Sequence, residues 1–227
     1  MVKSVIYSAA SFVVLVGGLG SALAQGFRQD ERGRFDFYVL SLSWSPSYCA
    51  AAHVRDTARV PGVECGARPF AFVVHGLWPQ YEHGFPEYCQ VPAPRLYRGI
   101  VDSMLDVMPA PRLVFNEWDR HGTCSGLSPR GYFDAVRKAR AGVKIPPEYV
   151  DLRAPLNVTP AAVEAAFAKA NPGLSSERMA IVCDHKRLTE VRICLSKELR
   201  FRDCAEVARR NCKRDQLVMP PVRGAPN

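Results

Sequence analysis

The stretch FDFYVLSLSW, at residues 35–44, decides the fold class that we expect. Its aromatic and aliphatic side chains recur at every second position, a period typical of a β-strand with one buried face. A second apolar run of strand length, at residues 70–74, ends directly before His75. The connecting residues 45–69 hold proline, glycine and two cysteines, which indicates a stapled loop or a short helix. The sequence therefore predicts two strands, the second of which delivers His75 at its end.

Three later segments carry apolar residues at three- and four-residue steps, the spacing of amphipathic helices. The first covers residues 94–108. The second begins at Ser128, has a proline in its first turn and stops near Gly142. The third starts at Thr159 and ends before the Asn-Pro-Gly sequence at residues 171–173. Three helices are therefore predicted between the strands.

Near the C-terminus, residues 190–195 (EVRICL) are predicted to form a strand, and residues 199–204 to return beside it as a hairpin. From Leu217 the chain turns to proline, glycine and small residues, which predicts a loosely held tail. Strands interleaved with helices indicate an α+β protein. We expect a single domain with a central antiparallel sheet, packed with several helices and stapled by disulfides.

Residues 1–24 have the pattern of a secretory signal peptide. Lys3 precedes a short apolar stretch, and Ala-Leu-Ala at residues 22–24 is a small-x-small cleavage pattern. A membrane anchor is the alternative, but glycines interrupt an apolar run shorter than the ~20 residues that a spanning helix needs. We therefore expect a soluble domain at residues 25–227, delivered to the periplasm or the medium and not held in a membrane.

The cysteines indicate an oxidising compartment. After the expected cleavage site their number is even, so four disulfides are predicted. A zinc site is the alternative, yet the sequence lacks the Cys-x-x-Cys pairs that structural zinc sites normally use. Spacing alone leaves about 105 pairings open. The eight cysteines are Cys49, Cys65, Cys89, Cys124, Cys183, Cys194, Cys204 and Cys212.

The formal net charge of +8 favours acidic partners, with nucleic acid first and anionic surfaces second. A basic protein whose charge only maintains solubility fits the same number equally well. Several enzyme classes are disfavoured, because the sequence has no Gly-x-Ser-x-Gly elbow, phosphate loop or paired-carboxylate signature.

Two segments carry the residues best suited to chemistry. Residues 72–80 read FVVHGLWPQ and residues 116–124 read NEWDRHGTC, and each contains one histidine. A helix through the second segment places Glu117 and His121 one turn apart, with Arg120 beside them. One helical face therefore gathers a carboxylate, a guanidinium and an imidazole.

Gly122 suits the end of that helix, and Cys124 is placed to tether it. The helix is not that of a zinc protease, because such a site needs two histidines, and NEWDRH lacks the first. Two imidazoles with pKa values near ~6.5 can hold opposite protonation states at one pH. Cleavage of RNA by its own 2′-hydroxyl needs such a pair, and requires no metal.

The sequence HGLWP, followed by EWxxHGTC, resembles the two active-site segments of the ribonuclease T2 family, the secreted acid and S-like ribonucleases. FYVLSLSWSPSYC, GFPEYC, CSGLSPRGYFDAVRKA and EVRICL also resemble the bacterial branch of that family. The resemblance implies a secreted, metal-independent endoribonuclease that cleaves single-stranded RNA through a 2′,3′-cyclic phosphate. It further implies a monomer without cofactors.

The resemblance assigns catalysis to His75, Glu117 and His121. Arg120 stands where the family usually has lysine, and would stabilise negative charge on phosphorus. Asn116 stands where the family usually has a third histidine that contacts phosphate. Because asparagine can donate a hydrogen bond but cannot become cationic, weaker phosphate binding or a changed pH profile is expected. Which of the two principal histidines is the acid stays open.

The resemblance also places Trp78 where a substrate base stacks and Gln80 where a base edge is contacted. Two rival functions follow from other features. A secreted basic RNA- or polyanion-binding protein with weakened catalysis would fit Asn116, and a metal-dependent phosphodiesterase would depend on a cation. The disulfide pairs that the resemblance implies are Cys49–Cys65, Cys89–Cys124, Cys183–Cys212 and Cys194–Cys204.

Overall fold

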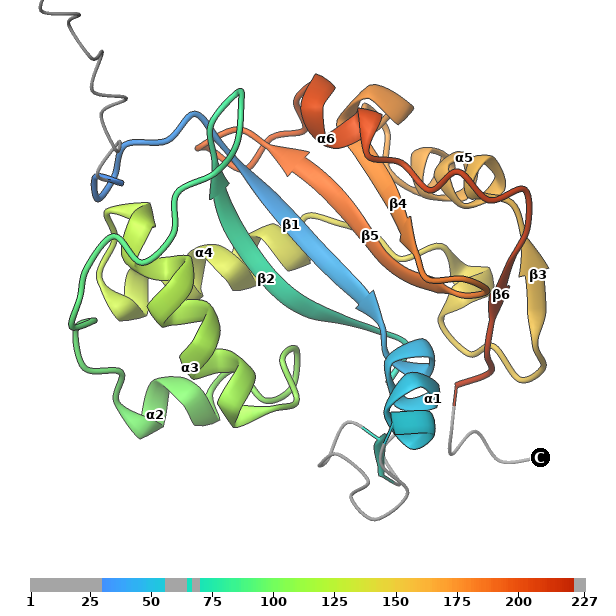
Figure 1. Cartoon of the computed structure of the whole chain (residues 1–227), viewed down its shortest axis with the longest axis horizontal. Coiled ribbons are helices and arrows are strands. Elements are labelled where there is room, and N and C mark those ends of the chain that lie inside the picture. The colour runs from blue at the N-terminus through green and yellow to red at the C-terminus, as the bar shows by residue number, and fades with distance from the viewer. Residues whose placement is uncertain (1–29, 56–64, 67–69, 223–227) are drawn as a thin grey trace, which may run out of the picture.

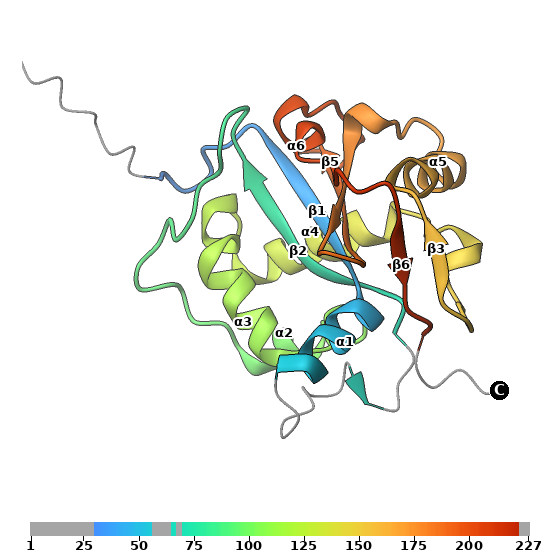
Figure 2. The ribbon, with the colours of Figure 1, turned by 45° about the vertical axis from the view of Figure 1, so that its right-hand side comes forward.

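The computed structural model describes residues 30–55, 65–66 and 70–222, so the expected signal peptide at residues 1–24 lies outside the described residues. The chain forms an α+β domain, as expected, in which a four-stranded antiparallel sheet has the order β2-β1-β5-β4. A two-stranded sheet of β3 and β6 lies beside α5 (Figure 2). The described strands are β1 (Phe37–Trp44), β2 (Phe72–Gln80), β3 (Leu156–Val158), β4 (Met179–Cys183), β5 (Leu188–Leu195) and β6 (Leu217–Met219).

Most helices of the described part lie toward one edge or the other of the sheet, whereas α1 continues from the end of β1 (Figure 1). α2, α3 and α4 lie on the β2 side, whereas α5 and α6 lie on the β4 side. The predicted helix starts are confirmed, since Ser128 and Thr159 are the N-caps of two helices and each accepts a backbone N–H through the side-chain oxygen. The helices are α1 (Ser45–Arg55), α2 (Arg98–Asp102), α3 (Pro111–Arg120), α4 (Pro129–Ala141), α5 (Pro160–Ala170) and α6 (Ala205–Arg209), with 3-10 turns at Gly122–Ser125, Pro147–Tyr149 and Ser176–Arg178.

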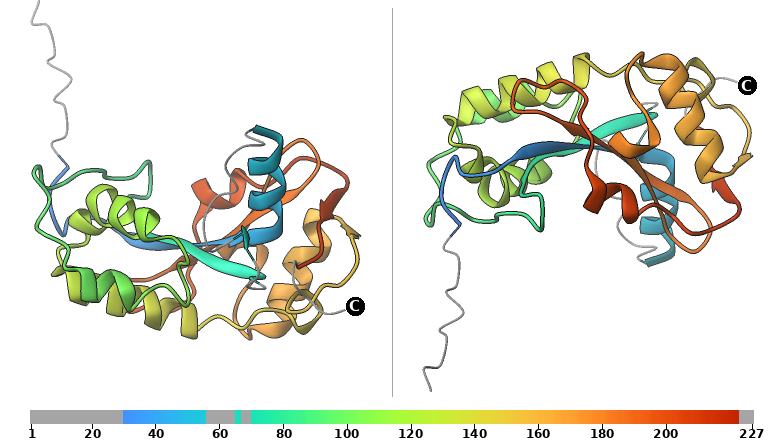
Figure 3. Two further views of the ribbon diagram at one scale, coloured as in Figure 1. Left: turned by 90° about the horizontal axis from the view of Figure 1, so that it is seen from below. Right: turned by 90° about the horizontal axis from the view of Figure 1, so that it is seen from above.

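The two faces of the sheet differ in character. One face packs against α3 and α4, and Leu40, Val74, Trp118 and Tyr132 are fully buried in this core. Seen from below and from above, α4 lies on one side of the sheet and α1 and α6 lie on the other (Figure 3). The second face carries only a small apolar cluster around Phe37, which leaves room for polar side chains.

Two expected elements have different bounds. The helix expected at residues 94–108 is helical only at Arg98–Asp102 and continues as turns, although Met104 is fully buried. The regularly spaced apolar residues of this segment are therefore largely buried, but they do not form one continuous helix. β2 does not end before His75 but runs on to Gln80, because its pairing with β1 continues.

Two expectations for the C-terminal part are also corrected. The hairpin expected at residues 199–204 is reduced to a single bridge between Leu195 and Phe201. Residues 217–222 of the tail expected from Leu217 are not loose, because β6 pairs with β3, and Met219 and Val222 are buried. β-pairing with a distant strand holds this segment, which the sequence of the tail alone does not reveal.

The structure contains the four disulfide pairs that the resemblance implied: Cys49–Cys65, Cys89–Cys124, Cys183–Cys212 and Cys194–Cys204. Among the described residues, no helix has both the length and the apolar character that a bilayer crossing requires.

Candidate active site

A β-bulge in β2 places His75. Two consecutive residues of β1 pair with Val74 and Gly76, which leaves His75 as the extra residue of β2. In a regular strand, His75 and Trp78 would point to opposite faces because they are three residues apart. The extra residue shifts the alternation of side chains by one position, so His75 and Trp78 lie on the same face and line the same cavity.

Gly76 provides the space in which the two motifs meet. A Cβ atom at this position would overlap the carboxylate of Glu117 and the indole nitrogen of Trp78. Any larger residue would therefore push apart the strand and the helix that supply the site. Gly122 is small for a similar reason, because a Cβ there would overlap the ring of Trp118.

Glu117 is the buried link between the two motifs. It lies on α3, is 5% exposed, and its Oε2 accepts a 2.7 Å hydrogen bond from the indole N–H of Trp78. Its Oε1 lies 3.7 Å from Nε2 of His75. Burial raises the pKa of Glu117 to about 7, although His75, Trp78 and Arg120 oppose the shift. The carboxyl group therefore changes protonation state near neutral pH.

The imidazole of His75 lies between two carboxylates. Nδ1 is 2.7 Å from Oε1 of Glu190, and Nε2 faces Glu117. Burial lowers the pKa of His75, but the hydrogen bond and charge of Glu190 and the charge of Glu117 outweigh burial and the nearby Arg192. The net result is a raised pKa, so His75 tends to hold its proton.

His121 has the opposite character. It is the C-cap of α3 and is 6% exposed, and its Nδ1 has no hydrogen-bond partner within the described part of the chain. Burial, Arg120 and His75 together lower the pKa of His121 to about 3. Its ring is therefore neutral at the pH where His75 is charged. As expected, the α-helix ends directly before Gly122, which opens the 3-10 turn that follows His121.

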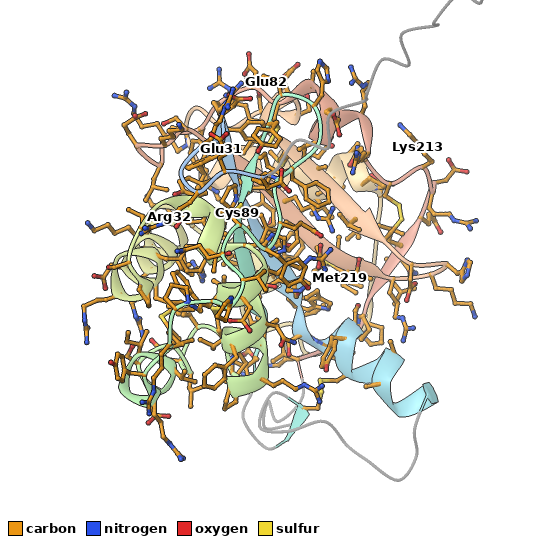
Figure 4. All side chains as sticks on the ribbon, turned by 60° about the vertical axis from the view of Figure 1, so that its left-hand side comes forward. Glu31, Arg32, Glu82, Cys89, Lys213 and Met219 are labelled. Atoms are coloured by element: carbon orange, nitrogen blue, oxygen red, sulfur yellow. A yellow bond between two sulfur atoms is a disulfide. The ribbon has the colours of Figure 1, made fainter. Side chains whose placement is uncertain are left out.

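The segment after β2 is fastened to the end of α3. Nε of Arg120 donates a 2.7 Å hydrogen bond to Glu87, and the backbone N–H of Tyr88 donates to the carbonyl oxygen of Arg120 at 2.8 Å. Cys89, labelled in Figure 4, continues this contact through its disulfide with Cys124. Arg120 thus lines the cavity but is already paired with a carboxylate.

Trp78 lies between the two histidines. Its ring centroid is 5.2 Å from that of His75 and 5.4 Å from that of His121. The guanidinium of Arg192 lies 5.0 Å from the centroid of the indole. Gln80 lies farther along the strand, and its side chain donates to the carbonyl oxygen of Pro79 at 2.9 Å.

One cavity of about 320 Å³ collects almost every residue that the sequence singled out. Asn116 is the exception, since it is exposed on α3 and is not among the residues that line the cavity. Glu190 and Arg192 were missed, although the alternation in EVRICL places both on the face opposite Val191. The predicted residues that line the cavity are His75, Trp78, Gln80, Glu117, Arg120 and His121.

A second cavity of about 340 Å³ shares His75 with the first and is also lined by Glu190. Ser43, Tyr48 and Leu113 contribute to its walls. His75 therefore stands at the boundary of two adjoining spaces. Within the ranges that the structure describes, no group of three or more His, Cys, Asp or Glu residues is arranged to hold a metal ion.

Comparison with known proteins places the chain in a family. The model of the ribonuclease T2 family matches residues 35–204. A ribonuclease of Aeromonas hydrophila is 34% identical over 194 residues, which cover 79% of this chain and 83% of that protein. Among solved structures, an RNase-related protein from Calystegia sepium superposes with a TM-score of 0.64 at 18% identity, over 82% of this chain and 98% of that one.

RNase NT in complex with 5′-AMP superposes with a TM-score of 0.57 at 22% identity, covering 83% of this chain and 99% of that one. At these identities the structural likeness shows only the fold, whereas the family match and the Aeromonas relative show membership of the family. The chain belongs to the ribonuclease T2 family, whose members are endoribonucleases.

Proposed function

We propose that this protein is a secreted, metal-independent ribonuclease that cleaves single-stranded RNA through a 2′,3′-cyclic phosphate. The observation that carries the proposal is the pair of imidazoles with opposite pKa shifts in one cavity. His121 is neutral and His75 tends to be protonated, so one can accept a proton while the other donates one.

We infer the role of each histidine from the direction of its pKa shift. His121, as the neutral ring, would accept the proton of the 2′-hydroxyl, and His75 would donate a proton from Nε2 to the departing 5′-oxygen. A phosphate bound between the rings would raise the pKa of His121, because negative charge favours the imidazolium form. Arg120 would exchange its contact with Glu87 for the phosphate and stabilise the charge that develops on it.

Glu117 is proposed to support His75 electrostatically. With a pKa of about 7, its carboxyl group is largely neutral below that pH and charged above it. In the charged form it stabilises the His75 imidazolium from 3.7 Å. Its hydrogen bond with Trp78 would also hold the indole in place for stacking on a base.

An RNA chain as substrate is supported by the two adjoining cavities, because cleavage within a strand requires a nucleotide on each side of the phosphate. Trp78 would stack one base, and Gln80 would contact its edge once released from Pro79. The 5′-AMP complex of RNase NT and the net charge of +8 are consistent with a nucleotide ligand.

Export is proposed on two grounds. The four disulfides fit an oxidising compartment. The pattern at residues 1–24 is that of a signal peptide, which would deliver the domain at residues 25–227 to the periplasm or the medium as a monomer.

A cleavage assay on RNA and on the matching 2′-deoxy strand, with and without excess EDTA, tests the proposal. We expect cleavage of RNA alone, at the same rate in EDTA. Binding of both strands without cleavage would favour the rival polyanion-binding protein. Loss of cleavage in EDTA would favour the metal-dependent phosphodiesterase, and either result would overturn the proposal.

A further inference from the structure

Glu190 and Arg192 on β5 contact both the acid and the aromatic ring of the proposed site. They are more than a hundred residues away from His75 in the sequence, and β5 is separated from β2 by β1. We infer that Glu190 is a positioning residue for His75 and that Arg192 holds Glu190 and Trp78 in register. This inference rests on the proposed role of His75 as the general acid.

Glu190 fixes the orientation of the imidazole. It is 9% exposed, and its Oε1 lies 2.7 Å from Nδ1 of His75. With Nδ1 held, the ring cannot rotate freely, and Nε2 is directed toward the cavity and Glu117. A carboxylate that holds one ring nitrogen so that the other performs proton transfer is the arrangement known from hydrolase triads.

Arg192 fixes the carboxylate in turn. It follows Glu190 by two residues, so both side chains emerge on the same face of β5. Its Nε and Nη2 lie 2.9 and 2.8 Å from Oε2 of Glu190, which leaves Oε1 for His75. The guanidinium also lies over the ring of Trp78, within the range of a cation–π contact. A single arginine thus ties the acid to the base-stacking residue.

Stability alone does not account for this pair. Removing charges from water costs free energy, so replacing a buried ion pair with apolar residues often leaves a protein equally stable or more stable. Yet Glu190 lines the second cavity and Arg192 lines the first, both from an inner strand of the sheet. The other carboxylate near His75, that of Glu117, is more distant and is already bound to Trp78. Glu190 therefore holds the His75 ring, whereas Glu117 holds the Trp78 indole.

The charged groups that face His75 set the expected pH behaviour. They are Glu117 from α3, His121 at its C-cap, and Glu190 and Arg192 from β5. Loss of the anion at Glu190 should lower the pKa of His75, whereas loss of the cation at Arg192 should raise it. A pair that does not contact the His75 ring in solution would produce neither shift.

NMR titration of the His75 ring, with the pH profile of kcat/KM, tests the inference on the full-length mature protein. In Glu190→Gln we expect a lower pKa of His75, a shift of the alkaline limb to lower pH, and about a tenfold to hundredfold loss of kcat. In Arg192→Met we expect the pKa of His75 to move upward. Glu164→Gln is the matched control, because that carboxylate accepts a hydrogen bond from Asn211 outside both cavities.

The titration needs no turnover, so it separates this inference from the proposed function. If the wild-type protein fails to cleave RNA, the proposed function is lost while the pKa shifts still report the contact. If Glu190→Gln lowers only the melting temperature and leaves the pKa of His75 and the alkaline limb unmoved, the inference is overturned. Should Glu190→Gln not fold, an unmoved pKa in Arg192→Met overturns it as well.

Discussion

At the scale of single residues, the site depends on atoms that are absent as much as on those that are present. Gly76 carries no side chain because the Glu117 carboxylate and the Trp78 indole occupy the space that a Cβ would take. Gly122 likewise carries no side chain because the ring of Trp118 occupies the space that a Cβ would take. The glycines of the HGLW and HGT sequences are therefore part of the geometry of the proposed site.

Replacing Gly76 with alanine should separate Glu117 from Trp78 and displace His75 within the bulge. Because misplacement by about 1 Å can cost on the order of 100-fold in rate, we expect a loss of kcat/KM of at least that size. The matched control is Gly99→Ala, because a Cβ on this helical glycine would meet no atom within 4 Å. Full activity in Gly76→Ala, measured on RNA, would contradict the close approach.

Glu117→Gln should separate stability from function. The pKa of Glu117 is raised from its ordinary 4.5 to about 7, so the native state is stabilised by the neutral carboxyl and loses this contribution as pH rises from 4.5 to 7. The variant has no carboxyl group to ionise, so as pH rises through this range its free energy of unfolding should increase relative to that of the wild type by on the order of 3 kcal/mol. Urea denaturation at pH 4.5 and 7.5 measures it, with kcat expected to fall. A difference that does not change with pH would refute the raised pKa.

Asn116→His restores the residue that the family usually has at this position. Because histidine can become cationic, we expect tighter phosphate binding and a pH profile altered around the pKa of the new imidazole, near ~6.5. Asn116 is exposed, so the fold should tolerate the change. The profile of kcat/KM over pH is the measurement, and an unchanged profile would show that the departure at Asn116 has no effect.

At the scale of elements, the sequence predicted the helices, which depend on residues close together in the chain, better than the strands, which depend on distant partners. The helices that begin at Pro129 and Pro160 were predicted because their caps and apolar stripes are continuous in the sequence. The bulge at His75 was not predicted, since it arises from register with a neighbouring strand. β4 and β6 were missed for the same reason, because short strands are defined by their partners.

The disulfide between Cys89 and Cys124 ties the segment carrying Glu87 to the end of α3. Replacing both cysteines with alanine should cost roughly 3–4 kcal/mol of stability and also lower kcat/KM, because Arg120 loses its fixed surroundings. Removing Cys183–Cys212, which closes a loop of comparable length, is the control for stability. Chemical denaturation and RNA cleavage measure both effects, and equal losses of activity in the two variants would contradict a special role for the first bridge.

At the scale of the whole molecule, the fold brings together groups from three distant parts of the chain. His75 and Trp78 come from β2, Glu117 and His121 from α3, and Glu190 from β5. The first two sets were predicted because their motifs resemble those of a known family. Glu190 was not, because neither motif contains it, and only the order of strands in the sheet brings it to His75.

Product analysis by ³¹P NMR tests the central claim that His75 and His121 act as acid and base on RNA. A diribonucleoside monophosphate is incubated in EDTA with the wild-type protein, with His75→Gln and with His121→Gln. We expect a 2′,3′-cyclic phosphate to accumulate with the wild type, and each variant to form it at least about 100-fold more slowly. Direct formation of a linear monophosphate, or undiminished cleavage by either variant, would contradict it.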